Sequence, residues 1–355
     1  MRIVQLLPTL VSGDAIGNDV VELDKILKEW GYDTQIYAQN VGRGIDPCMV
    51  GRGECYLQQI KPEDIVIYHL STGTTINDKL KQLQCKLIID YHNITPPAFF
   101  EKYSQDAVER SMKGIEGVIG LRNYAQYCLA DSEFNRKELL EYGYDCDIDV
   151  LPIFLTFDKF NKKPNKRIVT KYKDDFVNVI FTGRIAPNKK HEDIIKTYYF
   201  YKNYINSKSR LFLVGSFNGM EKYKKALDKY IEELGLQDVF FTGHVSFDNL
   251  LAYYKVADVF LCMSEHEGFC VPLLEAMHFR IPIIAYATTG VKDTLGECGM
   301  QMKEKDCKMA AEMINLLIND EKLRKQVIDE QLERLTDFSL EKTKNRFKEC
   351  LNKII

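Results

Sequence analysis

Short apolar runs rich in β-branched residues alternate with amphipathic stretches from one end of this 355-residue chain to the other. This alternation is typical of parallel β-sheets that are covered by helices on both faces. At about 150 residues per domain, the length favours two domains over one. We therefore expect an α/β protein with two Rossmann-like, doubly wound domains, each built on a parallel sheet.

The N-terminal half, residues 1–160, is predicted to form the first domain. Its clearest helix covers residues 17–30, where Val20, Leu23 and Leu27 fall on one stripe and Gly31 follows as a stop signal. The predicted strands of this half are residues 3–7, 34–38, 65–69, 87–91, 118–121 and 149–153.

The polar, lysine-rich segment 161–175 is typical of a crossing between two domains, and Pro164 interrupts it. The alternation restarts after it and predicts a second domain over residues 176–338. Residues 339–355 are expected to form a terminal helix, for which packing against the first domain is one arrangement. The predicted strands of the second domain are 177–181, 211–215, 239–242, 259–263 and 281–286, and its predicted helices are 191–204, 220–234, 247–256, 271–279, 307–318 and 321–335.

Composition and charge exclude several classes of protein. With 48 Lys and Arg against 51 Asp and Glu, the net charge is −3, which argues against a nucleic-acid binder with its usual basic excess. The ten cysteines show no CxxC pair, which predicts reduced and mostly buried thiols in a cytoplasmic protein. No apolar run approaches the roughly 18 residues that span a bilayer, and Pro8 interrupts the first run too early for a signal peptide. The lysines of segment 161–175 are more simply explained by solvation than by peripheral contact with the inner face of a membrane.

The segment 264–277, SEHEGFCVPLLEAM, joins a predicted buried strand to a predicted helix. Pro272 fits only the first turn of that helix. Gly268 allows a ligand to approach the backbone closely, and the free amides of the first turn are suited to bind an anionic group of that ligand. Glu267 and Glu275 then lie roughly 12 Å apart, a distance suited to two ends of one long polar ligand. That distance is too wide for the carboxylate pair of most glycoside hydrolases. The alternative is a common strand–loop–helix unit in which Glu267 only interacts with the helix dipole.

A second polar loop follows the predicted strand 177–181. Arg184 offers a planar fork and Lys189 a point charge, which are two complementary ways of neutralising a diphosphate. Gly183 and Pro187 restrict the loop between strand and helix. The alternative is a pair of solvated surface cations.

With these motifs, residues 176–300 resemble the C-terminal domain of the retaining glycosyltransferases with the GT-B fold, called glycosyltransferase group 1 or family 4. The matching elements are the Gly-Arg loop with its lysine at 183–189, Leu-Val-Gly at 213–215, Phe-Thr-Gly-His-Val at 241–245, Ala-Asp-Val-Phe at 257–260, and the Glu-x7-Glu motif at 267 and 275. The resemblance implies a GT-B architecture in which two Rossmann-like domains face each other across a cleft.

The resemblance also implies a role for individual residues. It implies that Arg184 and Lys189 hold the donor diphosphate, that Glu267 contacts the transferred sugar, and that Glu275 binds the ribose hydroxyls. Arg184, Lys189 and Glu267 are therefore expected to be catalytic. The other positions expected to bind the donor are Gly183, Gly215, His244, Val245, Gly268, Phe269, Cys270 and Val271. No cofactor beyond the nucleotide-sugar donor and no obligatory metal is expected, because the two cations neutralise the leaving diphosphate.

The N-terminal half offers weaker signals for an acceptor-binding domain. His92 follows the predicted strand 87–91, and the resemblance implies that it is a catalytic histidine facing the cleft and contacting the donor sugar. His69 ends the preceding strand in the same way and is a candidate for the acceptor or phosphate site. The alternative for both histidines is a satisfied structural residue. The loop 12–18 places Gly13 and Asp14 before a helix, where an acceptor hydroxyl or a phosphate would bind, although its spacing is not GxGxxG.

Together these features predict a retaining hexosyltransferase that moves a sugar from a UDP- or GDP-linked donor to an acceptor hydroxyl. The expected setting is the assembly of surface polysaccharides or glycoconjugates, with a saccharide or lipid-linked acceptor as partner and no nucleic acid. Two alternatives stay open. One is a nucleotide-sugar epimerase, which also uses two similar domains, and the other is a non-catalytic GT-B subunit that binds a partner glycosyltransferase.

Overall fold

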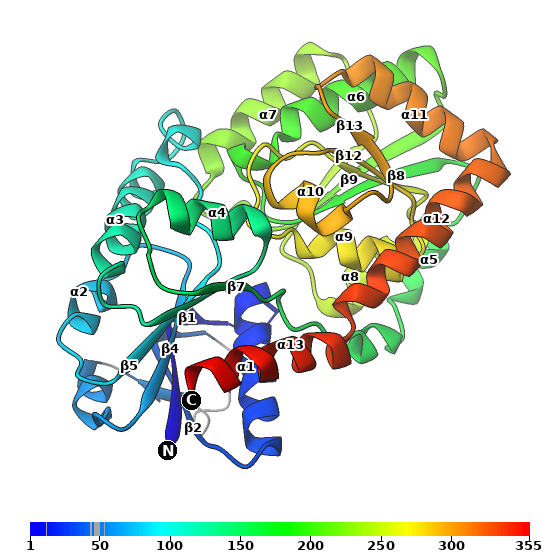
Figure 1. Ribbon diagram of the computed structural model, residues 1–355. Coiled ribbons are helices and arrows are strands. Elements are labelled where there is room, and N and C mark those ends of the chain that lie inside the picture. The colour runs from blue at the N-terminus through cyan, green and yellow to red at the C-terminus, as the bar shows by residue number, and fades with distance from the viewer. Residues whose placement is uncertain (12, 43–44, 46–49, 53) are drawn as a thin grey trace. The chain divides into compact units, whose positions relative to one another are not determined.

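The computed structural model describes all residues except 12, 43–44, 46–49 and 53 (Figure 1). The chain divides into two compact units. Unit 1 comprises Met1–Ala98, Asp106–Thr156 and Phe338–Ile355, and unit 2 comprises Phe99–Gln105 and Phe157–Asp337. Each unit is built on a parallel sheet, so the predicted α/β class with two Rossmann-like sheets is confirmed.

The sheet of unit 1 has the order β3-β2-β1-β4-β5-β6-β7. The chain moves outward from β1 to β3 and then continues on the other side of β1, so the strand order reverses between β1 and β4. The strands are β1 (Arg2–Leu10), β2 (Asp33–Val41), β3 (Val50–Arg52), β4 (Ile65–Leu70), β5 (Lys86–Tyr91), β6 (Tyr127–Ala130) and β7 (Ile148–Val150). The α-helices are α1 (Ala15–Glu29), α2 (Ile76–Leu80), α3 (Gln105–Leu121), α4 (Glu133–Glu141) and α13 (Leu340–Ile354).

Both faces of this sheet are buried, because successive residues of a strand point to opposite faces. In β1, Val4 and Leu6 belong to the apolar cluster on one face, whereas Ile3 belongs to the cluster on the other face. Helix α13 completes that second cluster, and its Phe347 stacks on Trp30 at the end of α1 with ring centroids 5.7 Å apart. The C-terminal helix therefore lies beside α1 within unit 1 (Figure 1).

One predicted strand, residues 118–121, is wrong, because these residues form the last turn of helix α3. Val118 and Leu121 are fully buried on the same helical stripe as Ser111 and Gly114. A four-residue apolar run does not distinguish a strand period of two from a helical period of 3.6. The strand of this region is β6, which pairs with β5.

The sheet of unit 2 has the order β10-β9-β8-β11-β12-β13. The strand order reverses between β8 and β11. The strands are β8 (Val177–Thr182), β9 (Ser209–Val214), β10 (Val239–Gly243), β11 (Val259–Cys262), β12 (Ile283–Tyr286) and β13 (Met300–Met302). The α-helices are α5 (Lys166–Tyr172), α6 (His191–Tyr204), α7 (Glu221–Glu233), α8 (Phe247–Val256), α9 (Val271–His278), α10 (Thr289–Leu295), α11 (Cys307–Asn319) and α12 (Glu321–Leu335).

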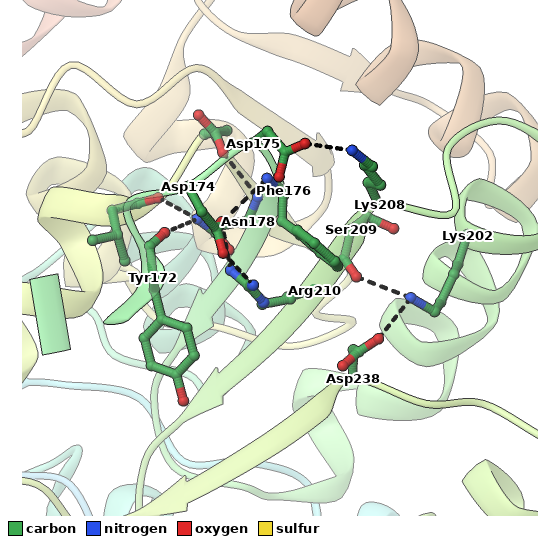
Figure 2. Close-up of polar contacts among 12 residues, drawn as sticks. Tyr172, Asp174, Asp175, Phe176, Asn178, Lys202, Lys208, Ser209, Arg210 and Asp238 are labelled. Carbon is green, nitrogen blue, oxygen red and sulfur yellow. Dashed lines mark hydrogen bonds and ion pairs between the residues drawn. The ribbon is translucent and has the colours of Figure 1, made fainter. Parts of the chain in front are cut away.

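The segment 161–175, expected as an interdomain crossing, lies within unit 2 and contains helix α5, while the units divide between residues 156 and 157. The end of the segment is fixed to the sheet by polar contacts (Figure 2). Both terminal nitrogens of Arg210 in β9 donate to the Asp174 carboxylate, at 2.9 and 2.6 Å. The side-chain amide of Asn178 in β8 donates to the Tyr172 carbonyl at 3.1 Å. These contacts explain why a lysine-rich stretch is ordered here.

Among the described residues, no helix combines the length and apolar character needed to cross a membrane. The cysteines whose side chains the structure describes, which run from Cys85 to Cys350, are free thiols. Ser12 of the predicted loop 12–18 and Cys48, one of the ten cysteines, lie outside the described residues.

Candidate functional site

The residues predicted to bind the donor follow the carboxyl ends of β8, β9, β10 and β11 in unit 2. In an open parallel sheet, ligands bind at the carboxyl ends of the strands where the strand order reverses. This point lies between β8, which leads to Arg184 and Lys189, and β11, which leads to Glu267. The topology thus places the two predicted motifs next to each other.

The loop after β8 is held against the loop after β9. The Gly183 amide donates to the Val214 carbonyl at 2.9 Å. A Cβ atom at Gly215 would lie 1.8 Å from the Gly183 carbonyl oxygen, so this approach of two backbones requires glycine at 215. Arg184 is exposed, and its Nη2 donates to the Asn218 carbonyl at 3.1 Å. The loop therefore presents a guanidinium at the edge of the site.

Lys189 and Glu267 form an ion pair between the loops after β8 and β11. Their side chains are only 20% and 7% exposed. Burial by itself would lower the pKa of Lys189, but the Glu267 carboxylate more than offsets it and the pKa is raised. The second carboxylate oxygen of Glu267 accepts from the Ser264 hydroxyl at 2.8 Å. A charged ammonium and a fixed carboxylate are therefore held together at the switch point.

The backbone after Glu267 is shaped by helix α10. The Glu267 amide donates to the Thr289 hydroxyl at 3.1 Å, and the Gly290 amide donates to the Glu267 carbonyl at 2.9 Å. A Cβ atom at Gly290 would lie 2.1 Å from the Gly268 carbonyl oxygen, so the two segments are in close contact. Cys270 has φ 78°, a left-handed conformation that turns the chain into helix α9. The amides of the first turn of α9 thus begin directly after the Glu267 loop.

Glu275 is positioned by a residue that the sequence analysis did not identify. The Tyr254 hydroxyl of helix α8 donates to Glu275 Oε2 at 2.5 Å and lies 2.5 Å from the Thr182 hydroxyl. Burial raises the pKa of Glu275. The sequence does carry a signal that Tyr254 is buried, because Tyr254 lies three residues after Leu251 and so falls on the same buried stripe of α8.

The remaining predicted donor residues have varied positions. Gly215 forms an isolated bridge with Gly243, so the exposed His244 and the half-buried Val245 follow directly beside the Gly215 loop. Phe269 and Cys270 are buried, whereas Gly268 and Val271 are half-buried. The structure therefore joins Gly183, Gly215 and residues 243–245 into one group of loops, and Lys189 and Glu267 into an ion pair.

The predicted acceptor loop of unit 1 contains the N-terminal cap of helix α1. The Asp14 carboxylate accepts from the Gly17 amide at 3.3 Å, and Gly13 has φ 86°. Both residues are exposed. A role in binding an acceptor stays a prediction, since capping alone explains the Asp14 contact.

His92 and His69 lie inside unit 1, among buried polar groups. The His92 side chain is 1% exposed. His92 Nδ1 lies 3.0 Å from both oxygens of Asp131, and His92 Nε2 lies 2.9 Å from His69 Nδ1. A catalytic role for His92 stays a prediction from the resemblance, and the contacts favour the structural alternative for both histidines.

The charges around His92 explain its ionisation. Burial by itself would lower the pKa of His92, but the Asp131 and Asp90 carboxylates more than offset it and raise the pKa to about 10. Burial also lowers the pKa of His69 and raises that of Asp19, where the charge of Asp90 adds to the effect. The sequence analysis did not identify these acids. The sequence carried a signal for two of them, because an aspartate stands at the carboxyl end of each apolar strand. Asp90 is the second-to-last residue of β5, and Asp131 directly follows β6.

Comparison with known proteins agrees with the geometry of unit 2. The profile of the family described as glycosyl transferases group 1 matches residues 161–334. Residues 161–334 form a group 1 glycosyltransferase domain. The matched residues include Lys189, Glu267 and Glu275, so the ion pair described above lies in the region that this family model covers.

Two curated relatives match over part of their length. The capsular polysaccharide biosynthesis glycosyltransferase CapM of Staphylococcus aureus is 30% identical over 184 residues, which are 49% of this chain and 45% of the relative. An uncharacterized glycosyltransferase of Methanocaldococcus jannaschii is 28% identical over 206 residues, which are 57% of this chain and 51% of the relative. The chain thus spans about half the length of these relatives.

The fold extends over the whole chain. The structure of HepE from Anabaena in complex with UDP-glucose matches with a TM-score of 0.76 and 17% sequence identity, covering 99% of this chain and 100% of HepE. This likeness shows that the group 1 domain is part of a GT-B fold and that unit 1 supplies the other Rossmann-like sheet.

Proposed function

We propose that the chain is a retaining glycosyltransferase that transfers a hexose from a UDP- or GDP-linked donor to an acceptor hydroxyl. The proposal rests chiefly on one observation, the buried Lys189–Glu267 pair at the strand-order reversal of a group 1 domain. This pair combines a cation for the donor phosphates with a carboxylate for the hydroxyls of a sugar.

The proposed transfer step needs stabilisation of a leaving nucleoside diphosphate. When the bond between the sugar and the phosphate breaks, negative charge develops on the β-phosphate. Lys189 and the exposed Arg184 supply positive charge, and the first-turn amides of α9 supply hydrogen-bond donors. Donors held in place before the reaction are commonly the largest contribution to such catalysis. The protein's own groups therefore provide the electrostatic stabilisation in this proposal.

The two glutamates are proposed to hold opposite ends of the donor. Glu267 is fixed by the Ser264 hydroxyl and by Lys189, which leaves its carboxylate oriented for hydroxyls of the transferred sugar. Glu275, eight residues further along the chain, is fixed by Tyr254 and is proposed to bind the ribose hydroxyls. Hydroxyl recognition by carboxylates gives charge-assisted hydrogen bonds, which are about twice as strong as neutral ones.

The setting of the reaction is proposed from the relatives. CapM is named for capsular polysaccharide biosynthesis, and HepE was solved with UDP-glucose. We propose a UDP- or GDP-hexose as donor, and a saccharide or lipid-linked saccharide of a surface polysaccharide or glycoconjugate as acceptor. The reaction would take place in the cytoplasm, and contact with a membrane surface would come from the acceptor.

The test compares donor use by the wild-type chain, by Arg184→Ala and by a matched control. Arg184 is exposed, so its loss leaves the core intact. Lys229→Ala is the control, because Lys229 pairs with Glu233 on an exposed helix face away from the loops of the site. UDP-glucose, UDP-galactose and GDP-mannose are each incubated with a panel of saccharide and lipid-linked acceptors, and nucleotide release and product mass are measured.

We expect transfer with one of these donors, a loss of about 100-fold or more in Arg184→Ala, and wild-type rates in Lys229→Ala. The anomeric coupling of the product in NMR spectra reports retention. Conversion of the donor without any acceptor would support the epimerase instead. Donor binding without turnover on any acceptor would support the non-catalytic subunit.

A further inference from the structure

Four potential metal ligands meet inside unit 1, outside the proposed donor site. They are Asp19 of α1, His69 of β4, Asp90 of β5 and His92 directly after β5, and one oxygen or nitrogen of each lies within 4.8 Å of the others. All four residues are buried. His69, Asp90 and His92 lie at the carboxyl ends of β4 and β5, beside the reversal of strand order between β1 and β4.

Three of these atoms form a compact triangle. His69 Nδ1 lies 2.9 Å from His92 Nε2 and 3.2 Å from Asp90 Oδ2, and His92 Nε2 lies 3.7 Å from Asp90 Oδ2. Two ligand atoms bound to one tetrahedral Zn²⁺ at about 2.0–2.2 Å are about 3.3–3.6 Å apart. The three observed distances, 2.9, 3.2 and 3.7 Å, lie on either side of this range.

The outer hydrogen bonds turn Nδ1 of His69 and Nε2 of His92 toward the centre of the triangle, where a bound cation would replace the proton between them. Gln5 Nε2 donates to the Val20 carbonyl at 3.1 Å, so its Oε1 accepts from His69 Nε2 at 3.0 Å. This places the proton of a neutral His69 on Nε2 and leaves Nδ1 as an acceptor. The Asp131 carboxylate in the same way accepts from His92 Nδ1. Metal-binding histidines are typically held by such a carboxylate or carbonyl at the other ring nitrogen.

The cluster is also rich in carboxylates. Asp19, Asp90 and Asp131 are buried around two imidazoles, and buried carboxylates are found paired or bound to a metal. Asp19 also accepts from the Phe154 amide at 2.6 Å, which fixes its side chain toward the cluster.

We propose that Asp19, His69, Asp90 and His92 bind a divalent cation, Zn²⁺ by the nature of the ligands. Two imidazole nitrogens and two carboxylate oxygens are ligands that Zn²⁺ accepts in tetrahedral geometry. Four protein ligands in a buried position make a closed, structural site. The ion would join α1 to β4 and β5 and stabilise unit 1, and its presence is measured by metal content, separately from transfer.

The first test measures the metal content of the untagged full-length chain after desalting. We expect about one Zn²⁺ per chain that is lost after treatment with a strong chelator. Addition of ZnCl₂ alone to the stripped protein should then raise its thermal midpoint, because the ion binds the folded chain preferentially. His69→Gln should lose the ion, whereas the control His278→Gln, which changes a half-buried histidine of unit 2, should keep it.

If His69→Gln fails to fold, a second variant and a visible absorption spectrum test the proposed site. Asp131→Asn leaves all four ligands in place and removes only the carboxylate that orients His92, so we expect roughly 10- to 100-fold weaker Zn²⁺ binding. Co²⁺ added to the stripped wild-type chain should give the visible bands of tetrahedral coordination without thiolate charge-transfer bands.

Three results would overturn the proposal. One is a wild-type chain that contains no metal and shows no thermal shift with Zn²⁺, Mn²⁺ or Fe²⁺, since a proton shared by His69 and His92 then occupies the centre. Another is an unchanged metal content in His69→Gln. The third is a Co²⁺ spectrum with thiolate bands, which would assign the ion to the cysteines.

Discussion

Replacing Lys189 by methionine removes the cation of the Lys189–Glu267 pair and keeps most of the side-chain volume. The variant leaves the Glu267 carboxylate, 7% exposed, with the Ser264 hydroxyl still donating to it at 2.8 Å. Loss of one partner of a buried ion pair costs about 3–5 kcal/mol, and the remaining hydrogen bond places this case at about 3 kcal/mol. For a domain of about 150–250 residues, this corresponds to a fall of about 6–12 °C in the thermal midpoint.

Catalysis should respond differently from stability. Loss of one preorganised charge at the leaving diphosphate costs about 2.7–4 kcal/mol of transition-state stabilisation, which is about 10²–10³ in kcat. Adding Glu267→Gln to Lys189→Met removes the unpaired charge, so the double variant should regain most of the lost stability. It should not regain transfer, because neither the cation nor the carboxylate is restored.

Calorimetry of the wild type, both single variants and the double variant gives the stability cycle. Initial rates measured well below the lowest midpoint give the activity cycle. Wild-type kcat in folded Lys189→Met would refute the assigned role of the cation. Recovery of transfer in the double variant would show that the pair serves only the packing of the two loops.

Three further predictions concern both units. Gly215→Ala should lower the thermal midpoint and weaken donor binding in calorimetric titration, because the added Cβ would lie 1.8 Å from the Gly183 carbonyl oxygen. An unchanged midpoint would contradict the close approach of the two loops. Tyr254→Phe should lower the free energy of unfolding by about 1–3 kcal/mol, since the Tyr254 hydroxyl donates to Glu275 at 2.5 Å. It should also raise the KM for the donor more than it changes kcat. A change confined to kcat would argue against the ribose contact. Burial raises the pKa of Glu138 from 4.5 to about 7, so the folded chain binds the Glu138 proton more tightly than the unfolded chain does. Protonated Glu138 therefore stabilises the fold fully below pH 4.5, and this stabilisation is lost as the pH rises through about 7. Glu138→Gln should remove this part of the pH dependence in thermal melts, and identical pH profiles of the two chains would refute the assignment.

Local patterns in the sequence predicted most of the elements. The helices predicted at 191–204, 247–256 and 321–335 have these bounds in the structure. Apolar periodicity is a property of neighbouring residues, so it is readable without knowledge of the fold. The error at 118–121 arose where a run was too short to show its period.

The sequence also determined the order of the motifs along the chain. Each predicted donor loop follows a strand, and the carboxyl ends of parallel strands share one edge of a sheet. By this rule, the loops that carry Arg184, Lys189 and Glu267 belong at one edge of the second sheet, and the strand order places them side by side.

Only the tertiary structure decided which side chains contact each other. Lys189 and Glu267 are 78 residues apart, and His92 and Asp131 are 39 residues apart. Such contacts depend on strand order, on side-chain rotamers and on which face is buried, and none of these is encoded in local periodicity. The fold therefore turned His92 toward buried carboxylates, while the sequence could state only that a histidine follows the end of a strand.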